Sequence, residues 1–233
     1  MRLELPRFIA HRCGGILAPE NTLAGLHTAA AAGFRAVEFD VMLSADGTPV
    51  LIHDETLERT TNGVGRVSET PDAVLFALDA GGGERIPTLA EAAALCRRLG
   101  LLANVEIKPA AGHERRTGEV VARAARALWA DAMPPLLSSF SIEALEVAAE
   151  AAPALPRGLL FDTVPADWLR RREALAATTL HCAAARITDT VLAEAAGEGV
   201  PVLCYTVNDR AQADLLQRRG VASLFTDRTD IFG

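Results

Sequence analysis

The chain has 233 residues, half of them apolar, and a formal net charge of −7 at pH 7. This length suits one large α/β domain or two small ones. The acidic balance, without a basic run or a basic amphipathic helix, argues against nucleic acid or an anionic membrane as the main partner. No apolar run is long enough to cross a bilayer. Four scattered cysteines without CxxC spacing, and no visible signal-peptide pattern, predict reduced thiols and a cytoplasmic location.

Short apolar runs typical of strands alternate with alanine-rich helical patterns along the whole chain. The predicted strands are Phe8–Ala10, Ala36–Leu43, Leu101–Ile107, Leu136–Ser139, Gly158–Phe161, Thr179–Cys182, Val202–Val207 and Ser223–Thr226. The predicted helices are Thr22–Ala32, Thr88–Leu99, Thr117–Trp129, Ile142–Ala151, Ala166–Ala176, Thr188–Glu198 and Arg210–Arg219. Eight such strands favour a (β/α)8 barrel over an open doubly wound sheet, and neither a GxGxxG fingerprint nor a P-loop supports the open sheet. We therefore predict a single α/β domain over residues 1–233, a TIM barrel.

One predicted hairpin brings several ionisable residues together. Its two strand-like runs flank Asp46-Gly47, a pair that suits a two-residue turn because both residues tolerate positive φ. Counting outward from that turn pairs residue 45 with 48, 43 with 50, and Asp40 with His53. Glu38 and Asp40 are two residues apart, so on a strand both carboxylates leave by one face. We therefore expect His53 to stand beside Asp40 and near Glu38.

The segment between this hairpin and the next helix is too long for a minimal barrel. It covers residues 54–87 and contains a polar loop, a weakly helical piece and the run Ala80-Gly81-Gly82-Gly83. Because it follows His53 directly, we predict a small inserted subdomain after the second strand, which acts as a lid or cap at the barrel mouth.

Polar and aromatic side chains gather at the predicted carboxyl ends of the strands, where barrel enzymes place their active sites. The candidate site residues there are His11, Arg12, Glu38, Asp40, His53, Glu106, Lys108, Phe140 and Tyr205. An alternative is that the charged members only neutralise one another, but buried ionised groups are costly without a function. Among the other histidines, we expect His27 and His113 on the surface and His181 as a hydrogen-bonded core residue.

The acids and bases of this set suit a metal-assisted reaction on a phosphate. Glu38, Asp40 and Glu106 form an all-oxygen ligand set, which suits a hard cation such as Mg²⁺ or Ca²⁺. Arg12 and Lys108 flank these acids and have the donors to hold phosphate oxygens.

The two histidines and the two aromatic residues complete the candidate site. His11 and His53 can serve as general base and general acid because an unperturbed histidine titrates near neutrality. Phe140 and Tyr205 are candidates for the walls of the substrate cleft. A cation, two basic side chains and two imidazoles together indicate phosphodiester cleavage.

A series of short motifs also runs in order along nearly the whole chain. They are His11-Arg12, Ala18-Pro19-Glu20-Asn21-Thr22, Glu38-Phe39-Asp40, Asp46-Gly47, His53-Asp54, Arg59-Thr60, Ile86-Pro87-Thr88-Leu89, Glu106-Ile107-Lys108, Ser139-Phe140, Tyr205-Thr206-Val207-Asn208 and Thr226-Asp227. Together they resemble the glycerophosphodiester phosphodiesterase family, in particular its short cytoplasmic bacterial members. The resemblance implies a TIM barrel with a small insertion after strand 2, a divalent cation on the three acids, catalytic roles for both histidines, and phosphate contacts from Arg12 and Lys108.

The activity implied by this resemblance is hydrolysis of a small-molecule glycerophosphodiester to sn-glycerol 3-phosphate and an alcohol. Two alternatives stay open, a phospholipase-like enzyme acting on lysolipids and a phosphate-binding module without turnover. The chain departs from the family at Cys13, where glycine is usual after His-Arg. We expect either a reactive thiol near the barrel mouth or a buried, inert one.

Overall fold

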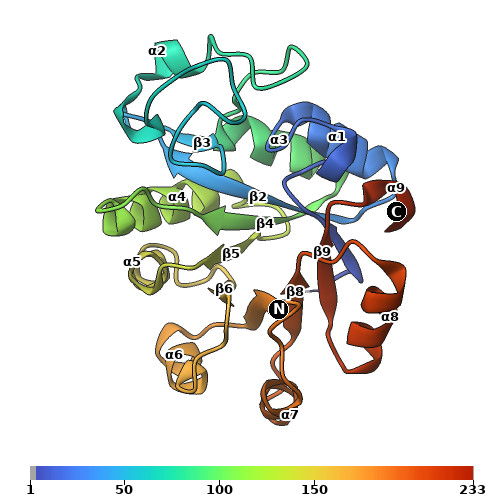
Figure 1. The fold of residues 1–233 in the computed structure, drawn as a ribbon. Helices are drawn as coiled ribbons and strands as arrows, with labels where there is room; N and C mark the ends of the chain where they lie inside the picture. The colour runs from blue at the N-terminus through green and yellow to red at the C-terminus, as the bar shows by residue number, and fades with distance from the viewer. Residues whose placement is uncertain (1–3, 233) are drawn as a thin grey trace.

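The protein folds as a parallel β-barrel wrapped by helices, and the computed structural model describes it from residue 4 to residue 232 (Figure 1). The strands are β1 (Phe8–Ala10), β2 (Ala36–Leu43), β3 (Pro49–Leu51), β4 (Leu102–Ile107), β5 (Leu136–Ser139), β6 (Arg157–Phe161), β7 (Thr179–Ala183), β8 (Val202–Tyr205) and β9 (Ser223–Thr226). Apart from β3, they run parallel in the order β1-β9-β8-β7-β6-β5-β4-β2, and a pairing of Ala10 with Val37 closes the ring. The predicted (β/α)8 TIM barrel is confirmed.

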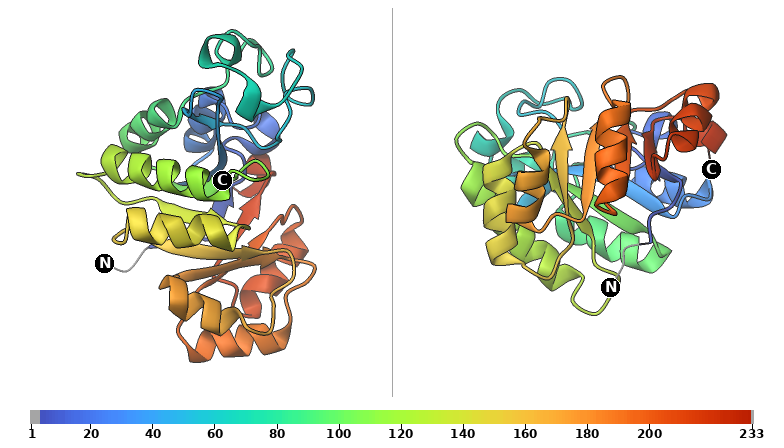
Figure 2. Two further views of the ribbon diagram at one scale, coloured as in Figure 1. Left: turned by 90° about the vertical axis from the view of Figure 1, so that its left-hand side faces the viewer. Right: turned by 90° about the horizontal axis from the view of Figure 1, so that it is seen from below.

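Helices follow the barrel strands and pack around the outside of the ring, as two further views show (Figure 2). They are α1 (Leu23–Ala31), α3 (Leu89–Leu99), α4 (Glu114–Leu128), α5 (Ile142–Ala151), α6 (Trp168–Leu175), α7 (Asp189–Gly197), α8 (Arg210–Arg218) and the short α9 (Thr229–Phe232). Most ends lie within two residues of the prediction. Helix α4 starts three residues before the predicted Thr117, because the Thr117 amide already donates to the His113 carbonyl at 2.8 Å and closes the first turn.

The barrel interior changes from apolar to polar along the strands. A lower interior layer, nearer the amino ends of the strands, consists of Ile9, Ala36, Leu102, Leu136, Leu203 and Phe225. An upper interior layer consists of five residues that follow Ala36, Leu102 and Leu136 by two or four positions, together with His181. The five residues are Glu38, Asp40, Asn104, Glu106 and Ser138. Because side chains alternate along a strand, β4 alone sends Leu102, Asn104 and Glu106 inward at successively higher levels. The lower layer therefore fills the barrel with apolar groups, and the upper layer forms the floor and wall of a polar mouth.

The hairpin of β2 and β3 has a register one residue away from the prediction, so the predicted pairing was wrong. Val41 pairs with Leu51 and Leu43 with Pro49. The turn has three residues instead of two: the Gly47 amide donates to the Ser44 carbonyl at 3.0 Å, and Gly47 has φ +85°. A three-residue hairpin turn commonly ends on a residue with this left-handed conformation, which glycine adopts without strain.

Residues 54–87 form a compact excursion beside β2 and β3, drawn in teal in Figure 1. It contains a 3₁₀ turn, η2 (Val67–Glu69), and the short helix α2 (Asp72–Leu75). Its apolar cluster consists of Met42, Val50, Ile52, Leu57, Val67, Leu75, Ile86 and Ala110. The two ends of the excursion meet, because the Leu51 amide donates to the Pro87 carbonyl at 2.8 Å and Val50 forms a β-bridge with Thr88.

Candidate active site

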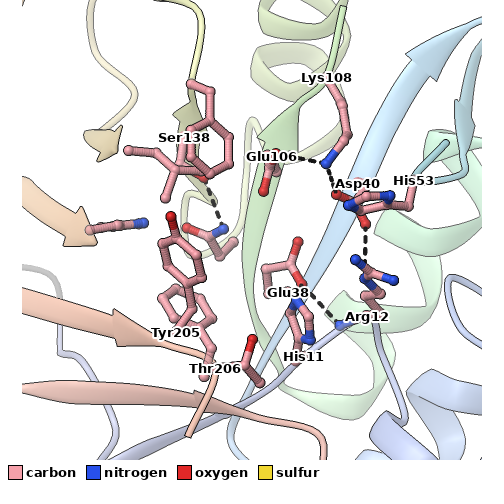
Figure 3. Close-up of a pocket in the computed structure, with 15 residues that line it drawn as sticks. His11, Arg12, Glu38, Asp40, His53, Glu106, Lys108, Ser138, Tyr205 and Thr206 are labelled. Atoms are coloured by element: carbon pink, nitrogen blue, oxygen red, sulfur yellow. Dashed lines mark hydrogen bonds and ion pairs between the residues drawn. The ribbon is translucent and has the colours of Figure 1, made fainter. Parts of the chain in front are cut away.

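A pocket of about 240 Å³ opens at the carboxyl ends of the barrel strands (Figure 3). All nine predicted site residues line it, together with Asn104, Ser138, Leu160, His181, Thr206 and Phe225. No residue between 54 and 87, a range that is described in full, lines this pocket. The apolar cluster of the segment packs beside the barrel against β2 and β3, and the role of the segment as a lid or cap stays a prediction.

Three carboxylates from two neighbouring strands meet at one side of the pocket. Glu38 and Asp40 come from β2, and Glu106 on β4 is the register partner of Asp40. One oxygen of each lies within 4.8 Å of the others. Glu38 and Asp40 are buried, and Glu106 is 9 % exposed. Burial and the neighbouring carboxylates raise the pKa of Glu38 well above its usual range and that of Glu106 to about 7, so the group resists full ionisation unless a cation is present.

The donor chemistry of this cluster fits a hard divalent cation. All three donors are carboxylate oxygens, the type that Mg²⁺ and Ca²⁺ prefer. Among the described residues, Oε1 of Glu38 has no hydrogen-bond partner although it is buried. A buried polar atom without a partner is rare and indicates a missing ligand, an ion or a water. The cluster is therefore a candidate site for a divalent cation.

Two basic side chains flank the acids (Figure 3). Lys108 Nζ lies 3.3 Å from both Asp40 Oδ1 and Glu106 Oε1. Burial favours a lower pKa for Lys108, but the two carboxylates outweigh it and raise the pKa. The Arg12 amide donates to Glu38 Oε2 at 2.9 Å, and Arg12 Nε lies 3.9 Å from Asp40 Oδ2. Lys108 also keeps the pKa of Asp40 low despite its burial, so Asp40 is ionised between two cations.

His11 is held by a carboxylate from the far end of the chain. Its Nδ1 lies 2.7 Å from Asp227 Oδ1, and its Nε2 lies 3.8 Å from Glu38 Oε2. Asp227 is fixed in turn by Asn208, whose Nδ2 donates to Asp227 Oδ2 at 2.9 Å. The hydrogen bond from His11 lowers the pKa of Asp227, so this carboxylate is ionised and accepts the Nδ1 proton. The other ring nitrogen, Nε2, lies on the side of Glu38, and His11 lines the pocket.

His53 reaches the pocket by a route that the predicted register did not describe. Ile52, and not His53, is bonded opposite Asp40, since the Ile52 amide donates to the Asp40 carbonyl at 3.2 Å. The chain leaves the sheet after Leu51, which lets His53 turn toward Asp40 and line the pocket. Its Nδ1 lies 2.5 Å from Asp54 Oδ1, and burial lowers its pKa. Both histidines therefore line the pocket with Nδ1 bound to an aspartate.

The opposite wall of the pocket is aromatic and neutral. Phe140 and Tyr205 meet edge to face with ring centroids 6.0 Å apart, and Phe140 is 48 % exposed at the rim. The Tyr205 hydroxyl donates to the Phe161 carbonyl at 2.9 Å. His181 shares a hydrogen bond of 2.9 Å with Thr179, and burial lowers its pKa to about 3, so it is neutral. It is the buried, hydrogen-bonded histidine that we expected, although it also lines the pocket.

Several residues that orient the site were not identified as site residues from the sequence. Asn21 exchanges two hydrogen bonds with Asp40: Nδ2 donates to Oδ2 at 2.9 Å, and Oδ1 accepts from the Asp40 amide at 3.1 Å. The next residue, Thr22, caps α1. Asp54 and Asp227 lie in the motifs His53-Asp54 and Thr226-Asp227, but the sequence analysis predicted no function for either aspartate. The available signal was a carboxylate directly after His53 and another directly after the last strand.

Cys13 is buried and packs in the core behind the mouth. Burial raises the pKa of its thiol well above the usual value, which favours the inert interpretation over the reactive one. Its backbone has φ +72°, a conformation that suits glycine better than any residue with a side chain.

Known proteins are similar to this chain in both fold and sequence. Residues 11–231 match the glycerophosphoryl diester phosphodiesterase family. The chain is 32% identical over 226 residues to a glycerophosphodiester phosphodiesterase of Caldanaerobacter subterraneus, covering 94% of this chain and 93% of that protein. An Oleispira antarctica phosphodiesterase, solved in complex with the product sn-glycerol-3-phosphate, is similar with a TM-score of 0.93 and 38% identity over 97% of this chain and 95% of that chain. A glycerophosphodiester phosphodiesterase from Agrobacterium tumefaciens has a TM-score of 0.80 and 28% identity, over 98% and 99% of the two chains.

The fold, the site and these similarities define a TIM-barrel enzyme of the phosphoric diester hydrolase class. The chain belongs to the glycerophosphoryl diester phosphodiesterase family. Within residues 4–232, no helix has the length and apolar character needed to span a bilayer.

Proposed function

We propose that this enzyme hydrolyses small-molecule glycerophosphodiesters to sn-glycerol 3-phosphate and an alcohol, with His11 and His53 as its acid/base pair. The observation that carries the proposal is the meeting of three carboxylates with two aspartate-bound histidines in one pocket. The product named for the Oleispira antarctica phosphodiesterase supports the choice of substrate class.

Glu38, Asp40 and Glu106 would hold the divalent cation, Mg²⁺ or Ca²⁺, which when bound supplies positive charge to the diester and acidifies an attacking hydroxyl. Arg12 and Lys108 hold the non-bridging phosphate oxygens, where negative charge increases in the transition state.

The two histidines move the protons. One Nε2 takes a proton from the attacking hydroxyl, and the other delivers a proton to the leaving alkoxide. Asp227 and Asp54 keep each Nδ1 protonated, so that each ring can exchange its proton only at Nε2. Phe140 and Tyr205 flank the alcohol portion of the substrate from the aromatic wall.

The test is release of glycerol 3-phosphate from a panel of diesters that carry choline, ethanolamine or glycerol. Purified enzyme should release it with Mg²⁺ or Ca²⁺ and lose activity in excess chelator, and either ion should restore turnover. Full activity after exhaustive chelation would contradict the metal site. Binding without release would indicate a phosphate-binding module, and turnover restricted to lysolipids would indicate a phospholipase-like enzyme.

A further inference from the structure

Arg59 is the one residue of segment 54–87 that joins two carboxylates at the edge of the active site, among the ion pairs of the described residues. Its Nη1 and Nη2 lie 2.8 Å and 2.9 Å from the two oxygens of Glu20. The same guanidinium contacts Asp54 through Nε, and through Nη2 at 3.1 Å. Arg59 does not line the pocket and is 46 % exposed at its side chain.

Each of these carboxylates holds a different pocket residue. Glu20 accepts two hydrogen bonds from Arg12 Nη1, at 3.1 Å and 3.3 Å. Asp54 is bound to Nδ1 of His53 at 2.5 Å. A continuous chain of hydrogen bonds therefore runs from Arg12 through Glu20, Arg59 and Asp54 to His53.

The chemistry of this chain of contacts requires an arginine. A guanidinium has donors on two edges, so it can bind two carboxylates at once, which a lysine ammonium cannot do with fixed geometry. The hydrogen bonds from Arg59 keep the pKa of Asp54 well below its usual range, and they keep the pKa of Glu20 low despite its burial. Both groups are then ionised, and they accept hydrogen bonds from Arg12 and from the Nδ1–H of His53.

We propose that Arg59 is a positioning residue, which fixes His53 and Arg12 in a common arrangement from outside the pocket. This role rests on the function proposed above for those two residues. It gives segment 54–87 a task in the reaction that does not depend on covering the mouth. The competing explanation is that Arg59 only anchors the segment to the barrel.

Arg66 provides a matched control for that competing explanation. It lies in the same segment, its side chain is also 46 % exposed, and it forms an ion pair with Glu55. Neither Arg66 nor Glu55 lines the pocket. If anchoring is the whole role, Arg59→Ala and Arg66→Ala should have similar effects on activity at equal stability.

The kinetic test compares these variants on the same diester. We expect Arg59→Ala to lower kcat/KM by about 10- to 100-fold, the usual size of the loss when a residue that orients an active-site group is removed. The value of kcat should fall because His53 is less well oriented, and KM should rise because Arg12 is less well oriented. Arg59→Lys should recover only part of the loss, and Arg66→Ala should stay within about twofold of wild type. Asp54→Asn should lower kcat/KM by a clearly smaller factor in the Arg59→Ala background than in the wild type. Equal activity of Arg59→Ala and Arg66→Ala would overturn the proposal. So would a double variant, Arg59→Ala with Asp54→Asn, whose fold-loss in kcat/KM equals the product of the two single losses.

A second measurement does not depend on turnover. Long-range ¹H–¹⁵N spectra of the histidine rings report the tautomer of His53, with Nδ1 protonated in the wild type. Arg59→Ala should change the His53 signals, and Arg66→Ala should leave them unchanged. Altered signals in an enzyme that hydrolyses no diester would support the positioning role and refute the proposed function. If the wild-type enzyme hydrolyses diesters but Arg59→Ala changes neither the His53 signals nor the rates, the proposed function stands and the positioning role of Arg59 is refuted.

Discussion

The two layers inside the barrel lie one above the other and contribute to folding in opposite ways. The lower interior layer is apolar, and full burial of a residue such as Leu136 stabilises the fold by roughly 1.5–3 kcal/mol. The upper interior layer contains Glu38, Asp40 and Glu106, and the raised pKa of Glu106 shows that its ionised form opposes folding. The lower interior layer, which stabilises the fold, therefore lies nearer the amino ends of the strands. The upper interior layer, whose charges disfavour folding, lies at the mouth of the pocket. Function occupies the ends of the strands because the fold does not need apolar groups there.

Removal of either histidine should separate the chemistry of the mouth from the stability of the barrel. His11→Ala and His53→Ala should each lower kcat by several orders of magnitude, since general acid–base catalysis contributes on the order of 10²–10⁴-fold per group. The kcat of the double variant should be only a little below that of the less active single variant, because both histidines serve one reaction. Steady-state kinetics with thermal unfolding test this, with the exposed His27→Ala as the control. A His53→Ala enzyme that keeps most of its rate would remove His53 from the mechanism.

Truncation in the lower interior layer should have the opposite pattern. Leu136→Ala should lower the free energy of unfolding by roughly 2–5 kcal/mol, because a cavity replaces a buried side chain. The kcat of the folded enzyme should stay within a few-fold of wild type, since Leu136 does not line the pocket. Urea unfolding and kinetics well below the transition provide both numbers. Lost activity with unchanged stability would mean that the two layers are not separable.

The pH dependence of stability should reveal the unfavourable charge in the upper layer. Glu106 has a pKa of about 7 in the folded chain, above its ordinary 4.5, so between these values the folded state holds a proton that the unfolded state lacks. The contribution of Glu106 to stability therefore falls as pH rises through that window. In chelator, Glu106→Gln should gain stability over wild type from pH 5 to pH 8, by on the order of 1–3 kcal/mol.

The comparison with Glu106→Gln reports the charge of Glu106 together with its coupling to Glu38 and Asp40. Chemical denaturation at several pH values measures the difference. A divalent cation should reverse the order at pH 8 by favouring the wild-type carboxylate. A difference that does not change with pH would contradict the raised pKa.

Cys13 should be the position of least effect. Cys13→Gly removes a strained left-handed side-chain position but also a small buried group, so stability should change by less than about 1 kcal/mol. Activity should be unchanged, and an alkylating reagent should leave the native thiol of Cys13 unmodified under conditions that preserve activity. Peptide mapping after alkylation checks this. Early modification of Cys13 together with loss of activity would place its thiol in the site.

The sequence was sufficient to predict the barrel because each strand is a short apolar run between alanine-rich helices. It also predicted nine of the fifteen residues that line the pocket, since the carboxyl ends of parallel strands meet at one rim. The hairpin register could not be obtained this way, because Asp46-Gly47 is compatible with both a two-residue and a three-residue turn. The partner of His11 was also hidden, since Asp227 is 216 positions away and approaches only when β9 pairs with β1.

The meeting of the two ends of segment 54–87 makes this part of the chain exchangeable. A backbone hydrogen bond joins Leu51 to Pro87, so the segment is a closed loop whose two ends meet at the barrel. Doubling the length of such a loop costs only about 0.6 kcal/mol in closure entropy. We therefore expect the barrel to tolerate a replacement of the segment that still covers Met42 and Val50, and such a replacement would change the surface beside the mouth. The replacement must still carry a guanidinium at the position of Arg59 if the two carboxylates are to stay in place.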